Sequence, residues 1–469
     1  MIKQKNFERL LLMGSCVLAA LLLVSHNYND ILVTTRHGIN LWDILLNGDF
    51  FAFYDLNRCA SGNIFYPKVQ GCAYNILVYI TFALWNLPLY LLERFAGVDV
   101  MNCIPCLVYA KLLPVVVMIG TFFLMKKILE TLEVPEKQHK LALYLYGTST
   151  AMTSIIFIAG QYDILSLALQ LLGFHAYIKK DDKKFLLWFS LAFCFKYFAG
   201  VIFLPLLLLR RKKIMEWIRS LVMLVIPLLI TKIPFVLHGL LAESLAGSGV
   251  KGDKMAAHLL GGMLGSSNAN ININFFMVAY ACILVWCFLQ DDDSEKRNGN
   301  AIWACLVAYA SFFGLLSAFP YWSILLTPFV ALALTLAPHR LYLGMILETV
   351  GMAGLIFTNM VRHHWVFFGE TLAPMIWSRI LKRADFVTEY YDSLIYRLIR
   401  TCYYEERFSP VVNSIFVAAM LALAYIAYTG RDGKNRLNWP EEKEYRDVLV
   451  VRFLVNALVC LLPIICAFI

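Results

Sequence analysis

Apolar runs about as long as a bilayer is thick follow one another along most of the chain, separated by short polar connections. A helix needs ~20 mostly apolar residues to cross a membrane. Such runs predict membrane-spanning helices at 10–25, 106–125, 140–159, 163–178, 214–236, 274–290, 300–318, 321–337, 341–360, 410–428 and 447–468. The pattern therefore predicts an all-α, polytopic membrane protein with about 11 to 13 transmembrane helices.

The apolar region 185–209 fits a single span less easily, because a basic cluster flanks it on each side, KKDDKK before it and RRKK after it. Positive clusters favour the cytoplasmic side. If both clusters lie there, the region enters the membrane and returns as a broken hairpin, with Lys196, Gly200 and Pro205 near the break. A single span is the alternative.

The same rule predicts which connections lie outside. KKILETLEVPEKQHK at 126–140 is expected inside, which places 26–105 outside. Asn86 and Pro88 interrupt the apolar region 72–95, so we expect it to lie on, or dip into, the outer leaflet. Further external segments are expected at 160–163, 237–273 and 361–409.

Composition agrees with a membrane protein. The chain is 60% hydrophobic and 16% charged, with a mean hydropathy of +0.67, which leaves too little polar surface for a soluble protein of this length. The net charge of +9 comes mostly from clusters at segment ends, a pattern that fits cytoplasmic anchoring and excludes a nucleic-acid partner. The N-terminal run is typical of an uncleaved signal anchor. The cysteines show no metal-ligand spacing, although Cys59 and Cys72 could form a disulfide.

The first external segment contains three aspartates, Asp43, Asp49 and Asp55. A carboxylate held beside the bilayer is partly desolvated, which raises its basicity and suits it to accept a proton from a hydroxyl. A solvated amphipathic loop is the plainer interpretation. Basic and polar neighbours that could bind substrate are Arg36, His37, Arg58, Tyr66 and Lys68.

The stretch GQYD lies between two apolar runs, at the second external position. Gln161, Tyr162 and Asp163 could line a site at the membrane surface. Alternatively, Asp163 could simply cap the following helix, where a carboxylate accepts hydrogen bonds from free backbone N–H groups. The Gly-, Ser- and Asn-rich segment 238–276 could close over a polar ligand.

Lys196 lies deep in the apolar stretch FCFKYFAG. Charged groups inside membranes are rare, and a functional role is the first hypothesis for each of them. An anion brought into the membrane would be the natural partner of this lysine, and a lipid phosphate is the obvious one. A lysine that extends to the interface is the alternative.

Several motifs resemble those of the C-type glycosyltransferases, the GT-C superfamily. They are IFYPKVQGCAYNILVYITFALW, GQYD, LAFCFKYFAGVIFLPLLLL and SAFPYWSILLTPFVALAL, which follow in order between residues 30 and 340. The resemblance is to mannosyltransferase-like enzymes that use a polyprenyl- or dolichyl-phosphate sugar as donor. It departs from the family at Lys68, where a second proline is common, and at Phe65, where some members have a catalytic aspartate.

The resemblance implies a GT-C-like catalytic module at 1–345, including the external loop, and C-terminal transmembrane helices at 346–469. It implies inverting transfer of a hexose from a polyprenyl-phosphate donor to a glycan, glycolipid or protein acceptor, outside a bacterial cell membrane. Asp43 is the first candidate for the general base, followed by Asp55 and Asp49. Lys196 or a basic residue of the loop would stabilise the leaving phosphate, and no cofactor or metal is expected.

Two other classes remain open. A flippase or transporter would also have many helices and intramembrane charges, but transporters often show repeat symmetry, which this sequence lacks. An O-antigen polymerase or ligase would also act outside on lipid-linked sugars, with arginines in a late external loop. The arginine-rich segment 362–400 fits that second class.

Overall fold

The computed structural model describes most of the chain. The described residues are 4–57, 59–60, 69–72, 74–235, 237–238, 274–291, 296–316, 318–367, 394, 397–398, 401, 408–432 and 439–466. Nearly all of them are helical, which confirms the all-α prediction. The described strands are β1 (Cys59–Ala60) and β2 (Val69–Gln70), which pair antiparallel. The thiol of Cys72, which the sequence allows to pair with Cys59, donates to the backbone oxygen of Asn57 at 3.6 Å.

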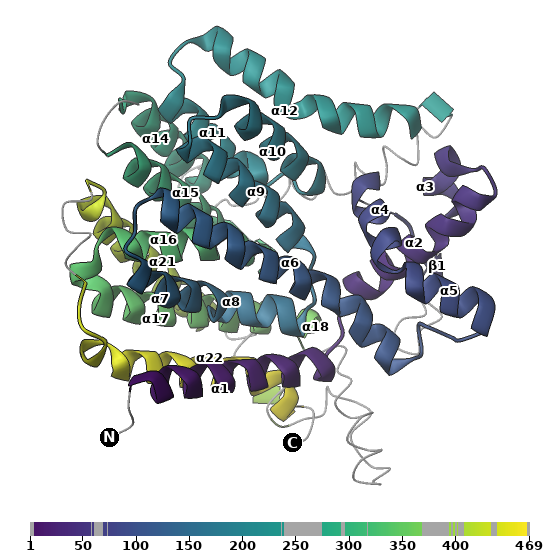
Figure 1. Ribbon diagram of the computed structural model, residues 1–469, viewed down its shortest axis with the longest axis horizontal. Helices are drawn as coiled ribbons and strands as arrows, with labels where there is room; N and C mark the ends of the chain where they lie inside the picture. The colour runs from purple at the N-terminus through teal and green to yellow at the C-terminus, as the bar shows by residue number, and fades with distance from the viewer. Residues whose placement is uncertain are drawn as a thin grey trace.

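A bundle of roughly parallel and antiparallel helices forms the body of the molecule (Figure 1). Its main helices are α1 (Gln4–Ser25), α6 (Ile104–Thr131), α7 (Glu136–Gly147), α8 (Thr150–Thr153), α9 (Asp163–Ile178), α10 (Asp182–Phe195), α11 (Ala199–Arg210), α12 (Ile214–Phe235), α14 (Phe275–Leu289), α15 (Arg297–Leu315), α16 (Thr327–Leu336), α17 (Leu341–Arg362), α18 (His364–Phe367), α21 (Phe408–Gly430) and α22 (Arg446–Cys466). The expected boundary after residue 345 falls inside α17.

Six of the described helices are long and apolar enough to cross a membrane, or eight if each of two bent pairs counts as one span. The sequence predicts more, because several of its apolar runs fold as shorter helices. These shorter apolar helices are Asp163–Ile178, Ala199–Arg210, Phe275–Leu289 and Pro320–Leu336. At 1.5 Å per residue, each is shorter than the ~30 Å hydrocarbon layer. The chain is therefore a polytopic membrane protein that combines full-length spans with shorter apolar helices.

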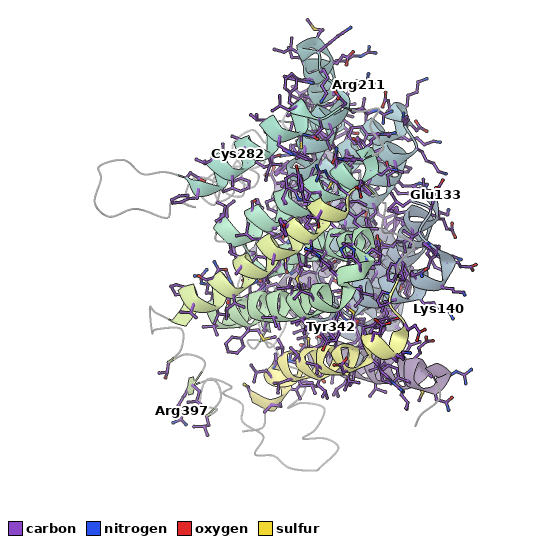
Figure 2. All side chains as sticks on the ribbon, turned by 90° about the vertical axis from the view of Figure 1, so that its left-hand side faces the viewer. Glu133, Lys140, Arg211, Cys282, Tyr342 and Arg397 are labelled. Carbon is purple, nitrogen blue, oxygen red and sulfur yellow. The ribbon has the colours of Figure 1, made fainter. Side chains whose placement is uncertain are left out.

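The bundle has two ends, which we name for reference. Glu133, Lys140 and Arg211 belong to the end that faces the viewer in Figure 2, which we call the basic end because the sequence places basic clusters in its connections. The helices from α2 (Asn29–Leu46) to α5 (Leu87–Ala96) lie at the opposite end, on the right of Figure 1, which we call the module end. The sequence predicts that the basic end lies on the cytoplasmic side.

The region 185–209 forms a hairpin of two helices, the alternative that the flanking basic clusters favour over a single span. Helix α10 ends at Phe195, and α11 begins at Ala199 and runs back toward the basic end. Asp182, in the first turn of α10, pairs with Arg210 at 2.7 Å and also with Arg211, so both ends of the hairpin lie together. Lys196 is at the break, as predicted, whereas Pro205 lies inside α11.

The module at the other end consists of α2 (Asn29–Leu46), the turn η1 (Phe50–Ala52), α3 (Phe53–Leu56), α4 (Ile76–Trp85) and α5 (Leu87–Ala96). Gly38 allows α2 to approach α4 closely, since a Cβ there would lie 2.8 Å from Phe82. Asn86 and Pro88 separate α4 from α5, and the chain bends by 61° there. This bend confirms the predicted interruption and leaves α4 and α5 as a bent pair beside the bundle.

A buried ion pair joins the C-terminal helices to the rest of the bundle. Arg452 of α22 bonds to both carboxylate oxygens of Glu348 in α17, at 2.7 and 3.0 Å, and both side chains are 3% exposed. Arg452 also donates to Thr148 and to the backbone oxygen of Leu145, at the end of α7. The pair thus connects three helices, and every guanidinium nitrogen of Arg452 donates a hydrogen bond.

Breaking this pair should destabilise the bundle more than removing it entirely. Arg452→Met alone leaves the Glu348 carboxylate buried without its partner, and we expect a loss of about 3 kcal/mol in unfolding free energy. The double variant Arg452→Met/Glu348→Gln should recover at least half of that loss. Thermal unfolding in detergent would measure both, and equal stability of the single and double variants would contradict this account.

Candidate active site

A buried ion pair at the module end forms the centre of the candidate site. Lys196, at the break of the hairpin, lies with its Nζ 2.9 Å from Oδ1 of Asp163, in the first turn of α9. The Asp163 side chain is 0% exposed and that of Lys196 is 10% exposed. An ammonium and a carboxylate at this depth are costly unless they are paired. The contact explains how the chain tolerates both charges.

Three tyrosine rings surround the Lys196 ammonium. Its Nζ lies 4.8 Å from the ring centre of Tyr74, 5.3 Å from Tyr162 and 6.0 Å from Tyr321. Ring faces attract a cation, most strongly where water is excluded. Tyr74 comes from the module, Tyr162 from the GQYD turn and Tyr321 from η4 (Pro320–Leu326). The lysine is therefore held where three separate parts of the chain meet.

Asp30 is a second carboxylate in this cluster. It is not among the site residues predicted from the sequence. Its Oδ2 accepts hydrogen bonds from the Tyr74 hydroxyl at 3.3 Å and from Nε2 of Gln161 at 3.4 Å. Unlike Asp163, it is half-buried, so a solute can reach it. Its signal in the sequence is the polar run SHNYND directly after the first apolar run, because so dense a polar stretch suggests a role at the membrane surface.

The GQYD turn is held in place by a buried lysine. Lys111 of α6 is 0% exposed, and its Nζ donates to the backbone oxygens of Leu23 at 2.9 Å, His26 at 2.5 Å and Phe157 at 2.9 Å. Gly160 follows with a φ of +61°, a conformation that glycine adopts without steric cost. This arrangement fixes the start of the module relative to the turn, and therefore Asp30 relative to Gln161.

A π-helical turn, η2 (Ser154–Ile158), precedes GQYD. Such turns are rare and frequently occur at functional sites. Tyr162 is the N-cap residue of α9 without a side-chain cap hydrogen bond, and the Asp163 carboxylate faces Lys196. Asp163 therefore lies in the first turn of α9, after the N-cap residue, and its carboxylate forms an ion pair with Lys196.

The structure brings together four of the residues predicted from sequence, Gln161, Tyr162, Asp163 and Lys196. Asp43 lies elsewhere on the module, exposed, where it accepts a hydrogen bond from Tyr90 at 3.0 Å. Asp49 is exposed before η1, and Asp55 is half-buried in α3. The predicted binding residues Arg58, Tyr66 and Lys68 lie outside the described residues.

Arg36 and His37 contribute to the module itself. Nη1 of Arg36 contacts both carboxylate oxygens of Glu93 in α5, at 2.6 and 2.7 Å. His37 is 1% exposed and its Nδ1 lies 3.0 Å from Oδ1 of Asn57. Both side chains connect parts of the module, and their role in substrate binding stays a prediction.

Burial gives His37 a pH-dependent effect on the module. Burial lowers the pKa of His37 from 6.5 to about 4, although the contact with Asn57 opposes this shift. Below pH 6.5 the unfolded segment binds a proton that the folded one excludes, so the module should lose up to about 3 kcal/mol between pH 6.5 and 4. Hydrogen exchange of the α2 amides, corrected for the intrinsic rate at each pH, would measure this loss. His37→Gln is the control, and an equal loss in that variant would contradict the assignment.

The arrangement can perform two complementary tasks. Asp30 is a reachable carboxylate that can take a proton from a hydroxyl. Lys196 is a cation in a site that excludes most water, where it can stabilise an anion far better than a lysine in solvent could. A reaction that removes a proton at one point and releases an anion at another would use both.

Comparison with known proteins identifies one family. The model of the EpsG family matches residues 115–367, more than half of the 469-residue chain. No curated protein and no solved structure matches the chain. The matched range contains GQYD, Lys196 and Tyr321, whereas Asp30 and Tyr74 precede it.

Proposed function

Because the chain belongs to the EpsG family, which comprises polytopic membrane proteins of glycosyltransferase or O-antigen polymerase type, we propose that it transfers a saccharide from a polyprenyl-phosphate-linked donor at the module end. The supporting observation is that Tyr74 contacts both the half-buried Asp30 and the Lys196 ammonium, while Gln161 donates to Asp30 and the Tyr162 ring lies beside Lys196. An O-antigen polymerase-type reaction fits the family at least as well as transfer to another acceptor.

Asp30 is the general base in this proposal, in place of Asp43. The acceptor hydroxyl gives its proton to the Asp30 carboxylate while its oxygen attacks the anomeric carbon of the donor sugar. The bond from that carbon to the phosphate oxygen breaks, and the lipid phosphate leaves with the electron pair. Attack opposite to the leaving group inverts the configuration, and no further co-reactant is needed.

Lys196 stabilises the negative charge that develops on the leaving phosphate. In the free enzyme the ammonium is held in place by its ion pair with Asp163. When the donor binds, its phosphate shares the ammonium with Asp163, and the tyrosine rings exclude water. Gln161 orients the base through its bond to Asp30.

A transfer assay in proteoliposomes would test the proposal. The purified protein is supplied with a radiolabelled polyprenyl-phosphate-linked saccharide and an acceptor, and the released polyprenyl phosphate is quantified together with the elongated product. We expect both in equal amounts, with inverted configuration at the new bond. Movement of intact donor between leaflets without cleavage would contradict transfer and favour a flippase.

A further inference from the structure

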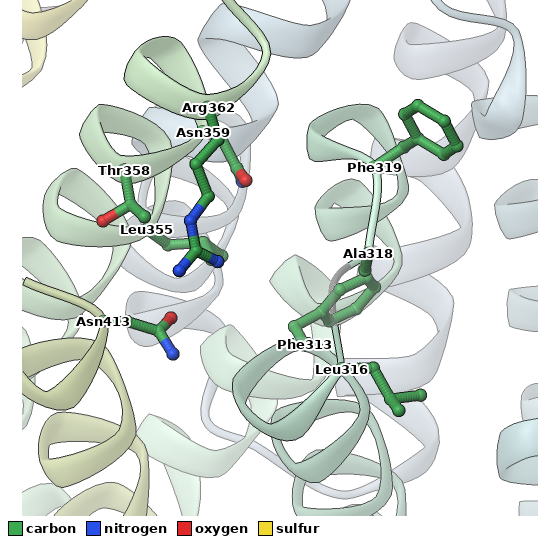
Figure 3. A pocket seen from close by; sticks show the side chains of 9 residues that line it. All are labelled: Phe313, Leu316, Ala318, Phe319, Leu355, Thr358, Asn359, Arg362 and Asn413. Atoms are coloured by element: carbon green, nitrogen blue, oxygen red, sulfur yellow. The ribbon is translucent and has the colours of Figure 1, made fainter. Parts of the chain in front are cut away.

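A small hollow is lined by residues of α15, α17 and α21. Figure 3 shows the side chain of Arg362 extending into it toward Asn413. The hollow has room for about one water molecule, so a substrate does not fit there. It therefore carries no second binding site, and the reactive groups that remain to be explained lie at the start of α6.

Two cysteines, separated by two residues, lie at the start of α6 in the sequence Cys103-Ile104-Pro105-Cys106. Cys103 is the N-cap residue, with extended backbone (φ −101°, ψ 109°), and its side chain forms no capping hydrogen bond. Cys106 is the third residue of the helix. The side chain of an N-cap residue reaches the third helical position, as it does in a capping box. The helix start therefore places the two thiols side by side.

The two thiols are free and differ in exposure. Cys103 and Cys106 form no disulfide, and their thiols lie within hydrogen-bonding contact of each other. Cys103 is half-buried, near the exposed residues Asn102 and Pro105, whereas Cys106 is 7% exposed. A solute can therefore reach the first thiol, and the second thiol lies in contact with it.

A pair of thiols with this spacing is also found as half of a metal site. A structural zinc site takes four ligands. Within the part of the chain that the structure describes, no group of three or more His, Cys, Asp or Glu side chains could hold a metal ion. Disulfide chemistry needs only the two thiols that are present.

The start of α6 belongs to the module end. Tyr109, in the second turn of α6, stacks on Trp85 at the end of α4, with ring centres 5.2 Å apart. Each of these side chains donates a hydrogen bond to the backbone oxygen of the other residue. The sequence predicts that this end lies outside the cytoplasm, where disulfides form and persist.

We propose that Cys103 and Cys106 are a redox-active dithiol that exchanges with an external disulfide compound. Cys103 loses its proton to solvent, attacks one sulfur of that compound and displaces the other sulfur as a thiolate. Cys106 then loses its proton, attacks the Cys103 sulfur of the mixed disulfide and displaces the second thiolate. The two cysteines are oxidised to one disulfide, and the external disulfide is reduced to two thiols. Reduction follows the same steps in reverse, as is typical of exposed disulfides.

Thiol trapping in proteoliposomes tests the pair directly. The wild-type protein is equilibrated with oxidised and reduced glutathione at a series of ratios, quenched with acid, alkylated and analysed by peptide mass spectrometry. Under oxidising conditions we expect a Cys103–Cys106 disulfide, with at least about a tenfold loss of the doubly alkylated peptide, and full recovery with excess reduced glutathione. Cys282→Ser, which removes an exposed thiol of α14, is the matched control and should behave as the wild type does.

Single substitutions separate the roles of the two thiols. In Cys106→Ser the mixed disulfide has no resolving thiol, so we expect a stable glutathione adduct on Cys103. In Cys103→Ser the buried Cys106 should form far less adduct. Full alkylation of both thiols in the oxidised wild type would overturn the proposal, and so would a glutathione adduct on wild-type Cys103 as abundant as in Cys106→Ser. Either result would identify the pair as small apolar packing groups. The wild-type measurement needs no substitution, so a variant that fails to fold leaves the test intact.

Discussion

Asp30→Asn is expected to reduce saccharide transfer by about a thousandfold, because it removes the proposed base and leaves the shape of the site intact. The asparagine oxygen can still accept the hydrogen bonds from Tyr74 and Gln161 that Asp30 receives. Donor binding should therefore change by about threefold or less. The loss should appear in kcat, which a transfer assay with saturating donor measures directly.

Two further variants make this test specific. Asp99→Asn changes an exposed aspartate of the module that accepts a hydrogen bond from Asn102, and it should retain full activity. Asp43→Asn distinguishes the structure from the resemblance, which ranks Asp43 first. If Asp43→Asn abolishes transfer and Asp30→Asn does not, the base lies in the loop, and the assignment to Asp30 is wrong.

The contrast between Asp30 and Asp43 shows what the sequence could predict of this site. The sequence predicts a catalytic carboxylate at Asp43, Asp49 or Asp55, whereas the proposal made from the structure places it at Asp30, nearer the start of the external segment. The choice depends on how α1 and α6 pack against η2, since Lys111 joins Leu23 and His26 to Phe157 across those elements. No local pattern encodes that three-way contact.

The position of Lys196 at the break of a helical hairpin was predictable for a physical reason. A charge inside an apolar run and basic clusters at both ends are local features, and each has a high energetic cost unless the chain adopts a particular topology. The partner of Lys196 was not predictable, because Asp163 could equally have capped its own helix. The sequence predicts more full spans than the described residues contain, because hydropathy measures apolarity, whereas several apolar runs fold as helices too short to cross a membrane.

The aromatic surroundings of Lys196 illustrate the same limit. Tyr321 belongs to a segment that resembles an aromatic-and-proline helix, yet seven of its residues, Pro320–Leu326, form the 3-10 helix η4. Tyr321 in that element lies beside the Lys196 ammonium. Apolar periodicity alone could not show that this short element lines the Lys196 site.

Replacing Lys196 should abolish donor recognition, and the design must account for Asp163. Lys196→Met alone strands a carboxylate that is 0% exposed, which destabilises the protein and confuses loss of function with loss of fold. The double variant Lys196→Met/Asp163→Asn removes both charges and should fold. We expect its apparent affinity for a polyprenyl-phosphate-linked saccharide to fall at least about thirtyfold, since a charge-assisted hydrogen bond to phosphate contributes about 2 kcal/mol or more.

Lys232→Met provides the matched control for that loss. Lys232 of α12 lies at the same end of the bundle and donates a hydrogen bond to the hydroxyl of Tyr197, next to the hairpin break. The Lys232→Met substitution removes one positive charge and leaves the Asp163–Lys196 ion pair intact, so donor affinity should change by about twofold or less. An equal loss in both variants would indicate a diffuse attraction of the surface for anions. A loss confined to the double variant requires that the donor phosphate reach the Lys196 ammonium. Three tyrosine rings shield this ammonium from water, and the Asp163 carboxylate fixes its position.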